Sequence, residues 1–454
     1  MTAAPARRSP TDPTDLADVA DLADISDPTD HTTAAARRPG LLRRHRDFRL
    51  LFAGEVAGKY GSSVTGLALP LIAVTRLHAS AFQVSALTAA SWLPWLLIGL
   101  PVGAWVDRLR RRPVMLAAAA TSLLLYLTVP VAAVLGLLDY PQLLAVALCA
   151  GAATVFFQTA YTAYLPSLVS AADRAEGNAK LQGSASAAQI VGLGTGGTLA
   201  QAFGPVNSLL ANTATFLVSL LCTSSIRQRE ARPKPAARRR HLLGEVGEGL
   251  RLVLGDRWLR PFLLYGAAAN LALTAYQSIQ VVFLLDHVHL PESALGTLIG
   301  AASLGGVLGA LTARRLGAAI GTARAVLLCQ LGLPSLVLLI PLTGRGAGVL
   351  CYLIGGLAVS GGVVAGNVLR ATFTQSYVPV ELLGRTSAAG AFLNYGLMPL
   401  GALLGGSLAG RLGVLPAMWL GCAGLPLAAL LLWFSPLRHH RDLPTGSIVR
   451  AAAA

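Results

Sequence analysis

The chain has 454 residues, of which 54% are hydrophobic and 13% charged, and its formal net charge is +15 at pH 7. Soluble proteins carry about 25% charged residues, and a mean hydropathy of +0.60 excludes a disordered chain, a nucleic-acid-binding domain and an ordinary soluble enzyme. The positive charge stands in short arginine clusters between long apolar stretches. This pattern is typical of a protein that crosses a membrane many times.

The N-terminal segment differs from the rest of the chain. Aspartate recurs at every third position from Asp12 to Asp30, and apolar residues are few. A period of three fits neither a helix face nor a strand, so we predict a disordered acidic tail over residues 1–40. A solvated, dispensable tail and an acidic arm that docks on the basic face both remain open.

The apolar stretches can be assigned to membrane spans. A helix needs about 20 apolar residues to cross roughly 30 Å of hydrocarbon. Single spans are predicted for the uncharged ranges 82–106, 113–138, 140–172, 261–285, 293–313, 325–344, 346–369, 386–410 and 412–437. Residues 181–226 are long enough for two spans, divided near Phe203-Gly204-Pro205, and residues 50–75 add one more. We therefore predict an all-α membrane protein with twelve transmembrane helices.

The loops predict the orientation. If the N-terminus is cytoplasmic, only Arg76, Arg345 and Arg411 fall in outside loops. The inside loops then hold Arg43 to Arg49, Arg108 to Arg112, Arg174, Lys180, the set from Arg227 to Arg257, Arg314, Arg315, Arg324, Arg370, Arg385, Arg438 and Arg441. Cytoplasmic loops are the ones enriched in Lys and Arg, so both termini are expected inside.

An internal repeat divides the chain into two halves. Gly192, Gly196, Gly197 and Gly204 recur as Gly401, Gly405, Gly406 and Gly413, at an offset of 209. Two other sets of residues recur at offsets of 206 and 213. We predict six-helix halves at 41–226 and 258–437, a basic cytoplasmic linker at 227–257 and a tail at 438–454. In transporters built from parallel repeats, the substrate site lies between the halves.

Small residues recur at helical spacing in the fifth and eleventh predicted helices. Gly192 and Gly196, like Gly401 and Gly405, stand four residues apart, which lets two helix backbones approach closely. Static packing and a sliding contact between helices both remain open for these positions.

One loop carries a family resemblance. The segment GAWVDRLRRRP at 103–113 resembles the signature between the second and third helices of the major facilitator superfamily. The segments FRLLFAGEVAGKYGSSVTGLALPL, EGLRLVLGDRWLRPFLL, GNAKLQGSASA and QSYVPVELLGRTSA are similar to a branch that holds enterobactin-type siderophore exporters and macrolide-efflux-type pumps. The resemblance covers about residues 45–435. Departures are Trp105 and Arg110 in the loop, and Gly192-Leu193 where relatives often have Gly-Pro.

Glu55 and Lys59 are the clearest ionisable residues inside a predicted span, and such residues are functional candidates because charge is costly in hydrocarbon. They stand four residues apart with the acid first, the favourable order for pairing on a helix. Glu55 could carry a proton that breaks the pair and frees Lys59 for an anion. A purely local ion pair and direct contact with substrate are the alternatives.

The resemblance also implies a cytoplasmic gate at the end of the second helix. Asp107 would bind the N-terminal end of the eleventh helix near Thr386, where a helix dipole favours negative charge. The alternative is that the arginines only anchor the topology. The predicted gate residues are Asp107, Arg108, Arg111, Glu381 and Arg385.

Polar and aromatic residues near the middle of the spans are candidates for the substrate pocket. Amides and phenols supply hydrogen bonds in an otherwise apolar cavity. The candidates are Trp92, Gln158, Tyr161, Asn270, Tyr276, Gln277, Asn394 and Tyr395. For each of them, hydrogen bonding between helices or a place in an interfacial belt is the competing interpretation.

Together these features predict a secondary active transporter in the cell membrane of a bacterium. We find no ATP-binding loop, catalytic triad, dinucleotide fingerprint or metal site, so neither an enzyme nor a cofactor is expected. The expected partners are a small amphipathic substrate, protons and lipid, without nucleic acid, and a monomer is expected. Export by proton antiport is our main hypothesis. Uptake by a symporter or facilitator, and a non-transporting membrane scaffold or sensor, are the alternatives.

Overall fold

The computed structural model describes residues 41–169, 173–228 and 242–444, and every regular element in these ranges is helical. The tail predicted for residues 1–40 lies outside them. The first half forms α1 (Leu41–Arg44), α2 (Arg46–Leu77), α3 (Ala81–Arg108), α4 (Arg111–Val134), α5 (Tyr140–Leu168), α6 (Arg174–Phe203) and α7 (Pro205–Ser224). The rest forms α8 (Leu242–Gly255), α9 (Leu259–Val282), η3 (Phe283–His287), α10 (Glu292–Ile320), α11 (Thr322–Leu327), η4 (Leu328–Gly332), η5 (Pro334–Leu342), η6 (Gly346–Gly348), α12 (Val349–Tyr377), α13 (Val380–Gly396), α14 (Met398–Leu412), α15 (Val414–Trp433) and η7 (Pro436–His439).

The spans agree in number with the prediction. Ten helical stretches of the described chain are long and apolar enough to cross a membrane. α2 and α6, with 32 and 30 residues, are as long but less apolar, because α2 holds Glu55 and Lys59 and α6 is rich in small and polar residues. With these two, twelve spanning helices are present, which confirms the predicted fold class.

The repeat is visible at one corner of each half. Gly204 joins α6 to α7 with φ +81°, and Gly413 joins α14 to α15 with φ +91°. Only glycine adopts such a conformation at little cost. The two glycines are 209 residues apart, the offset of the sequence repeat, so a repeated motif produces a repeated turn. The division predicted near Gly204 is therefore present.

The eleventh span is broken in its middle. α13 ends at Gly396 and α14 begins at Met398. Pro399 has no N–H to donate, and its ring would clash with the carbonyl of Tyr395 in a continuous helix. The chain therefore turns at Leu397, directly beside two of the predicted pocket residues.

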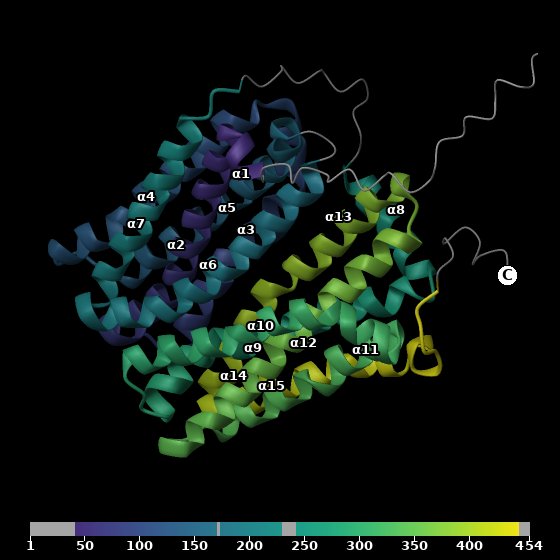
Figure 1. Ribbon diagram of the computed structural model, residues 1–454. Coiled ribbons are helices and arrows are strands. Elements are labelled where there is room, and N and C mark those ends of the chain that lie inside the picture. The colour runs from purple at the N-terminus through teal and green to yellow at the C-terminus, as the bar shows by residue number, and fades with distance from the viewer. Residues whose placement is uncertain (1–40, 170–172, 229–241, 445–454) are drawn as a thin grey trace, which may run out of the picture.

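The two halves meet at one end, which we call the closed end. A Cβ atom built on Gly197 of α6 would lie 2.5 Å from the Cα atom of Gly296 of α10. The Oγ atoms of Ser85 (α3) and Ser278 (α9) are 3.2 Å apart. The two groups of helices lie together near α10 and α14 and diverge toward α1 and α8 (Figure 1).

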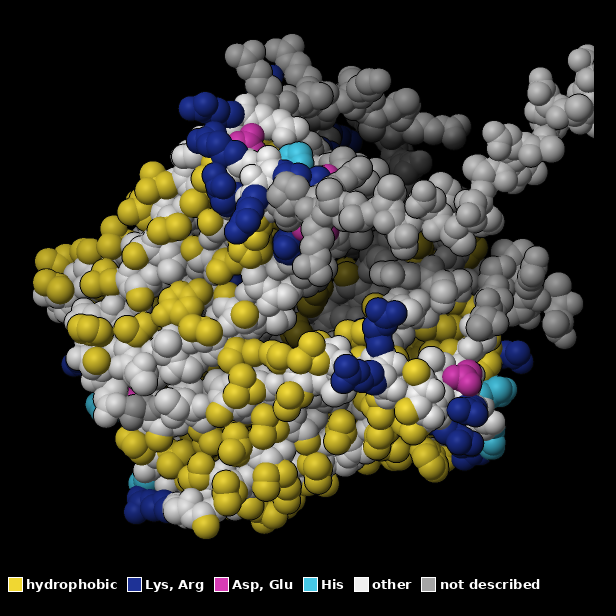
Figure 2. Space-filling model, in the orientation of Figure 1, with side chains coloured by type: hydrophobic (Ala, Val, Ile, Leu, Met, Phe, Trp, Pro, Cys, Tyr) yellow, Lys and Arg dark blue, Asp and Glu magenta, His cyan; other side chains and the backbone are white. Residues whose placement is uncertain are grey.

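The surface reflects two environments. Figure 2 shows hydrophobic side chains along the flanks of both halves and Lys and Arg gathered toward the ends. The end that holds α1, α8 and the Arg108–Arg112 loop is called the basic end. Between the halves at this end the surface is hollowed (Figure 2), so the space between the halves opens on the basic side.

Candidate functional site

Glu55 and Lys59 form an ion pair on α2. The Nζ atom of Lys59 lies 3.6 Å from Oε1 of Glu55, and their side chains are 37% and 6% exposed, respectively. α2 packs against α6 and α7 of its own half and touches α9 of the other half. The Glu55 carboxylate is thus buried, while the side chain of Lys59 is partly exposed.

Two side chains of α5 complete this cluster. Gln158 is hydrogen-bonded to Glu55, and Tyr161 is in electrostatic contact with it. The hydroxyl of Tyr161 is buried, and no described residue forms a hydrogen bond with it. Four residues predicted separately from the sequence, on two different spans, are therefore neighbours. We call them the Glu55 cluster.

The second half contains a polar cluster that the sequence analysis did not identify. Arg370, which we had counted among the loop cations, lies inside α12 and is only partly exposed. Its Nη2 atom donates to Oδ1 of Asn367 at 3.2 Å. The helix stop at Pro379 was the signal for this position, because it leaves Arg370 about two turns inside the helix end.

Aromatic residues from both halves meet between the two clusters. The ring of Tyr395 on α13 stacks on Trp92 of α3, with centroids 6.0 Å apart and an interplanar angle of 11°. It also contacts Trp95, at 4.9 Å and 41°. Two predicted pocket residues are thus brought together across the boundary between the halves, and Tyr395 is 37% exposed there.

The three pocket candidates on α9 lie in different surroundings. Tyr276 is 4% exposed and belongs to a hydrophobic core that also includes Leu67 and Leu71 of the first half. Gln277 is exposed and hydrogen-bonded to Tyr276. Asn270 is half-buried, and its backbone carbonyl accepts a hydrogen bond from Thr274.

The predicted gate lies at the basic end. α3 ends at Arg108, which is exposed, and Arg111 is half-buried in the first turn of α4. The side chains of Asp107 and Glu381 lie outside the described part of the structure. Arg385 of α13 has a carboxylate partner, because its Nη1 atom lies 2.8 Å from Oε1 of Glu248 on α8.

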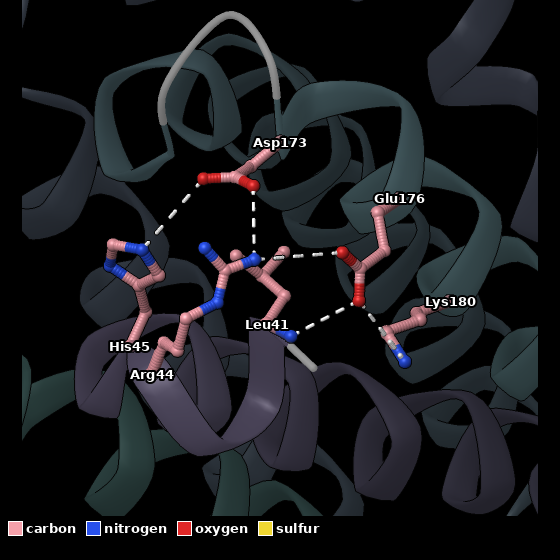
Figure 3. A network of polar contacts seen from close by, with 6 residues as sticks. All are labelled: Leu41, Arg44, His45, Asp173, Glu176 and Lys180. Atoms are coloured by element: carbon pink, nitrogen blue, oxygen red, sulfur yellow. Dashed lines mark hydrogen bonds and ion pairs between the residues drawn. The ribbon is translucent and has the colours of Figure 1, made fainter. Parts of the chain in front are cut away.

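A second network at the basic end holds α1 against the start of α6 (Figure 3). The backbone N–H of Leu41 donates to Oε1 of Glu176 at 3.1 Å, and Arg44 lies 3.2 Å from Asp173. The hydrogen bond from Leu41 is the main cause that lowers the pKa of the Glu176 carboxyl. All these residues belong to the first half, so the network braces that half.

The recurring glycines pack equivalent helices in the two halves. A Cβ atom on Gly192 would lie 2.7 Å from the carbonyl oxygen of Tyr60, which puts α6 directly on α2. Gly196 is next to Val64 of the same helix. In the second half, Cβ atoms on Gly401 and Gly405 would lie 2.3 and 2.1 Å from carbonyl oxygens of α9.

Known proteins resemble most of the chain. The multidrug efflux pump Tap of Mycolicibacterium fortuitum is 29% identical over 402 residues, which are 84% of this chain and 95% of Tap. The enterobactin exporter EntS of Escherichia coli K12 is 28% identical over 422 residues, 89% of this chain and 95% of EntS.

Solved structures show the same fold. A mutant of the nucleoside transporter NupG matches with a TM-score of 0.68 at 13% identity, covering 86% of this chain and 99% of NupG. A bacterial homologue of the iron transporter ferroportin matches with a TM-score of 0.65 at 17% identity, covering 87% and 99%. Residues 42–449 match the family described as transmembrane secretion effectors. The chain therefore belongs to this family of multi-pass major facilitator transporters, as the sequence resemblance implied.

Proposed function

We propose that this transporter exports a small amphipathic molecule, such as a drug, an antibiotic or a siderophore-like compound, in exchange for protons. The printed activities of Tap and EntS are both forms of export. The observation that carries the proton exchange is the Glu55 cluster, in which an enclosed carboxylate on α2 has an accessible cation as its partner. An ionisable pair inside a membrane-spanning helix is costly in free energy, so its presence indicates a functional site.

The basic end is cytoplasmic in this proposal. Lys and Arg concentrate on the cytoplasmic side of membrane proteins, so substrate would enter the hollow between the halves from the cytoplasm. The transporter then reorients by rocking of its halves, which opens the closed end and closes the basic end. Asp107 and its neighbouring arginines would act as the cytoplasmic gate in the state in which the basic end is closed.

The proton step follows from the ion pair. When Glu55 is charged, it holds Lys59. A proton that arrives from outside neutralises Glu55, breaks the pair and frees the Lys59 ammonium. Loss of that proton to the cytoplasm restores the pair, so one cycle of the halves can move one proton inward.

The test is efflux from pump-depleted bacterial cells, with a panel of dyes, macrolides and siderophores. We expect wild-type efflux to be abolished by a protonophore and reduced at least tenfold by Glu55→Gln. Asp286→Asn is the matched control, because Asp286 is an exposed acid outside the cluster, and it should transport normally. Undiminished, protonophore-sensitive efflux by Glu55→Gln would contradict proton transfer at Glu55. Accumulation of a substrate inside the cells would favour uptake instead.

A further inference from the structure

Arg370 is a cation inside a membrane-spanning helix that the proposed proton exchange does not use. It donates to Asn367, and no carboxylate of the described residues forms an ion pair with it. Its other electrostatic contacts are the phenols Tyr265 and Tyr395. A guanidinium inside a membrane-spanning helix is costly without an anionic partner, and no described residue supplies one, so a bound anion would balance its charge.

A hydrogen-bond acceptor, Oδ1 of Asn394, lies beside this cation. A Cβ atom on Gly266 would lie 2.9 Å from Nη1 of Arg370 and 2.7 Å from Oδ1 of Asn394. Both polar groups therefore pack directly against Gly266, and the absence of a side chain at this glycine lets them lie close to each other. Oδ1 of Asn394 is buried and has no hydrogen-bond partner among the described residues, whereas buried polar groups are nearly always paired. A bound molecule with both an anionic oxygen and a donor would satisfy the two groups together.

An aromatic surface adjoins these two groups. Tyr395 follows Asn394 in the chain, contacts Arg370 electrostatically and stacks on Trp92. Planar rings prefer such offset stacking, and guanidinium groups are attracted to ring faces. A planar ligand can therefore lie against Tyr395 and Trp92 while its charged end reaches Arg370.

We propose that Arg370, Asn394 and Tyr395 form a binding site for aromatic organic anions. The carboxylate or phenolate binds Arg370, a ligand donor meets Asn394, and the ring stacks on Tyr395 and Trp92. This inference rests on the proposed transport function and names a substrate class for the same pathway. Because Trp92 belongs to the first half and Arg370 to the second, one bound molecule touches both halves.

The test is binding to purified full-length protein in lipid nanodiscs, measured by calorimetry without any ion gradient. The probes are 2-naphthoate and its neutral, nearly isosteric counterpart 2-naphthamide. We expect the wild type to bind naphthoate at least tenfold more tightly than naphthamide. R370Q should remove this preference and leave the naphthamide affinity unchanged. R411Q is the matched control, because Arg411 is exposed at the closed end, and it should keep the preference.

Equal affinity for the two probes in the wild type, no binding of either, or an intact preference in R370Q would overturn the proposal. If R370Q does not fold, R370K must keep the preference for naphthoate, and Y395L must lose affinity for both probes. A negative result in the binding test would not change the result expected of the efflux assay with Glu55→Gln. Conversely, a protein without proton coupling would still show the binding preference, so the two proposals fail separately.

Discussion

Tyr161 has a buried hydroxyl next to Glu55 that forms no hydrogen bond within the described part of the chain. Tyr161→Phe removes no hydrogen bond from the fold, so the free energy of unfolding should change by less than about 0.5 kcal/mol. We expect efflux to fall several-fold, because the hydroxyl is available to substrate or to a proton-carrying water. Thermal unfolding and efflux are measured together.

Tyr140→Phe is the matched control for that substitution. The Tyr140 hydroxyl donates to the carbonyl of Gln83 at 3.0 Å, so its loss should cost about 1 kcal/mol of stability and leave efflux intact. Equal behaviour of the two variants would mean that the Tyr161 hydroxyl has only a structural role.

Gly401 lets α14 touch α9, and the contact leaves no room for a side chain. A Cβ atom there would lie 2.3 Å from the carbonyl oxygen of Leu271, so Gly401→Ala should lower the free energy of unfolding by about 1–3 kcal/mol through overpacking. Gly410 of the same helix has nothing within 4 Å, and Gly410→Ala should cause no loss. Chemical denaturation in detergent compares the two, and equal stability would show that the helices can separate freely.

The polar residues could be predicted as candidates by type, but their grouping could not. Glu55 and Lys59 are four residues apart on one helix, so their pairing follows from local geometry. Gln158 and Tyr161 join them only because α5 packs beside α2, which no local pattern encodes. Arg370 was assigned to a loop because charge ends an apolar stretch, although the helix continues to Tyr377.

At the scale of helices, α1 depends on a single carboxylate for part of its docking. Glu176 lies in the first turn of α6, before the apolar stretch that begins at residue 181, and its pKa is lowered chiefly by the Leu41 N–H. A lowered pKa means that the charged form favours docking. The stabilisation of α1 docking by the charged carboxylate is complete above the ordinary Glu pKa of about 4.3. It is lost as the pH falls through the lowered pKa of Glu176.

We therefore expect Glu176→Gln to speed hydrogen exchange of the α1 amides at pH 7. In the wild type, the protection of these amides relative to an unfolded chain should fall as the pH drops through the lowered pKa of Glu176. Glu248→Gln, which removes an exposed acid paired with Arg385, should leave exchange in α1 unchanged. Slow exchange in Glu176→Gln would mean that Arg44 and Asp173 suffice to hold the helix.

The helix boundaries that have a steric cause could be predicted from the sequence. Gly204 and Pro205 divide a long apolar stretch at the predicted place, since glycine accepts the positive φ and proline begins the next helix. The turn at Leu397 has a similar cause in Pro399, yet an uncharged stretch continues through it, and the sequence analysis treated it as one helix. α8 lies within the predicted basic linker and packs on α13, where Glu248 pairs with Arg385.

At the scale of the whole molecule, the sequence repeat predicts two similar halves but not the faces on which they meet. Trp92 and Tyr395 come from the second and eleventh spans, and their stacking depends on how far one half is tilted against the other. In the proposed rocking movement that tilt changes during transport, so a sequence that serves both states cannot specify a single contact surface. Whether the halves separate at the closed end can be tested by cross-linking them there.

Ser85 and Ser278 are suitable positions for this cross-link. Their Oγ atoms are 3.2 Å apart across the two halves at the closed end, close enough for cysteines at these positions to reach disulfide geometry. In a variant without the native cysteines, oxidation of S85C/S278C with iodine should lower efflux at least tenfold, because the closed end can no longer open. Reductant should restore transport, and neither single variant should respond to iodine. Full transport by the cross-linked protein would mean that the halves need not separate at this end, which would refute the rocking movement.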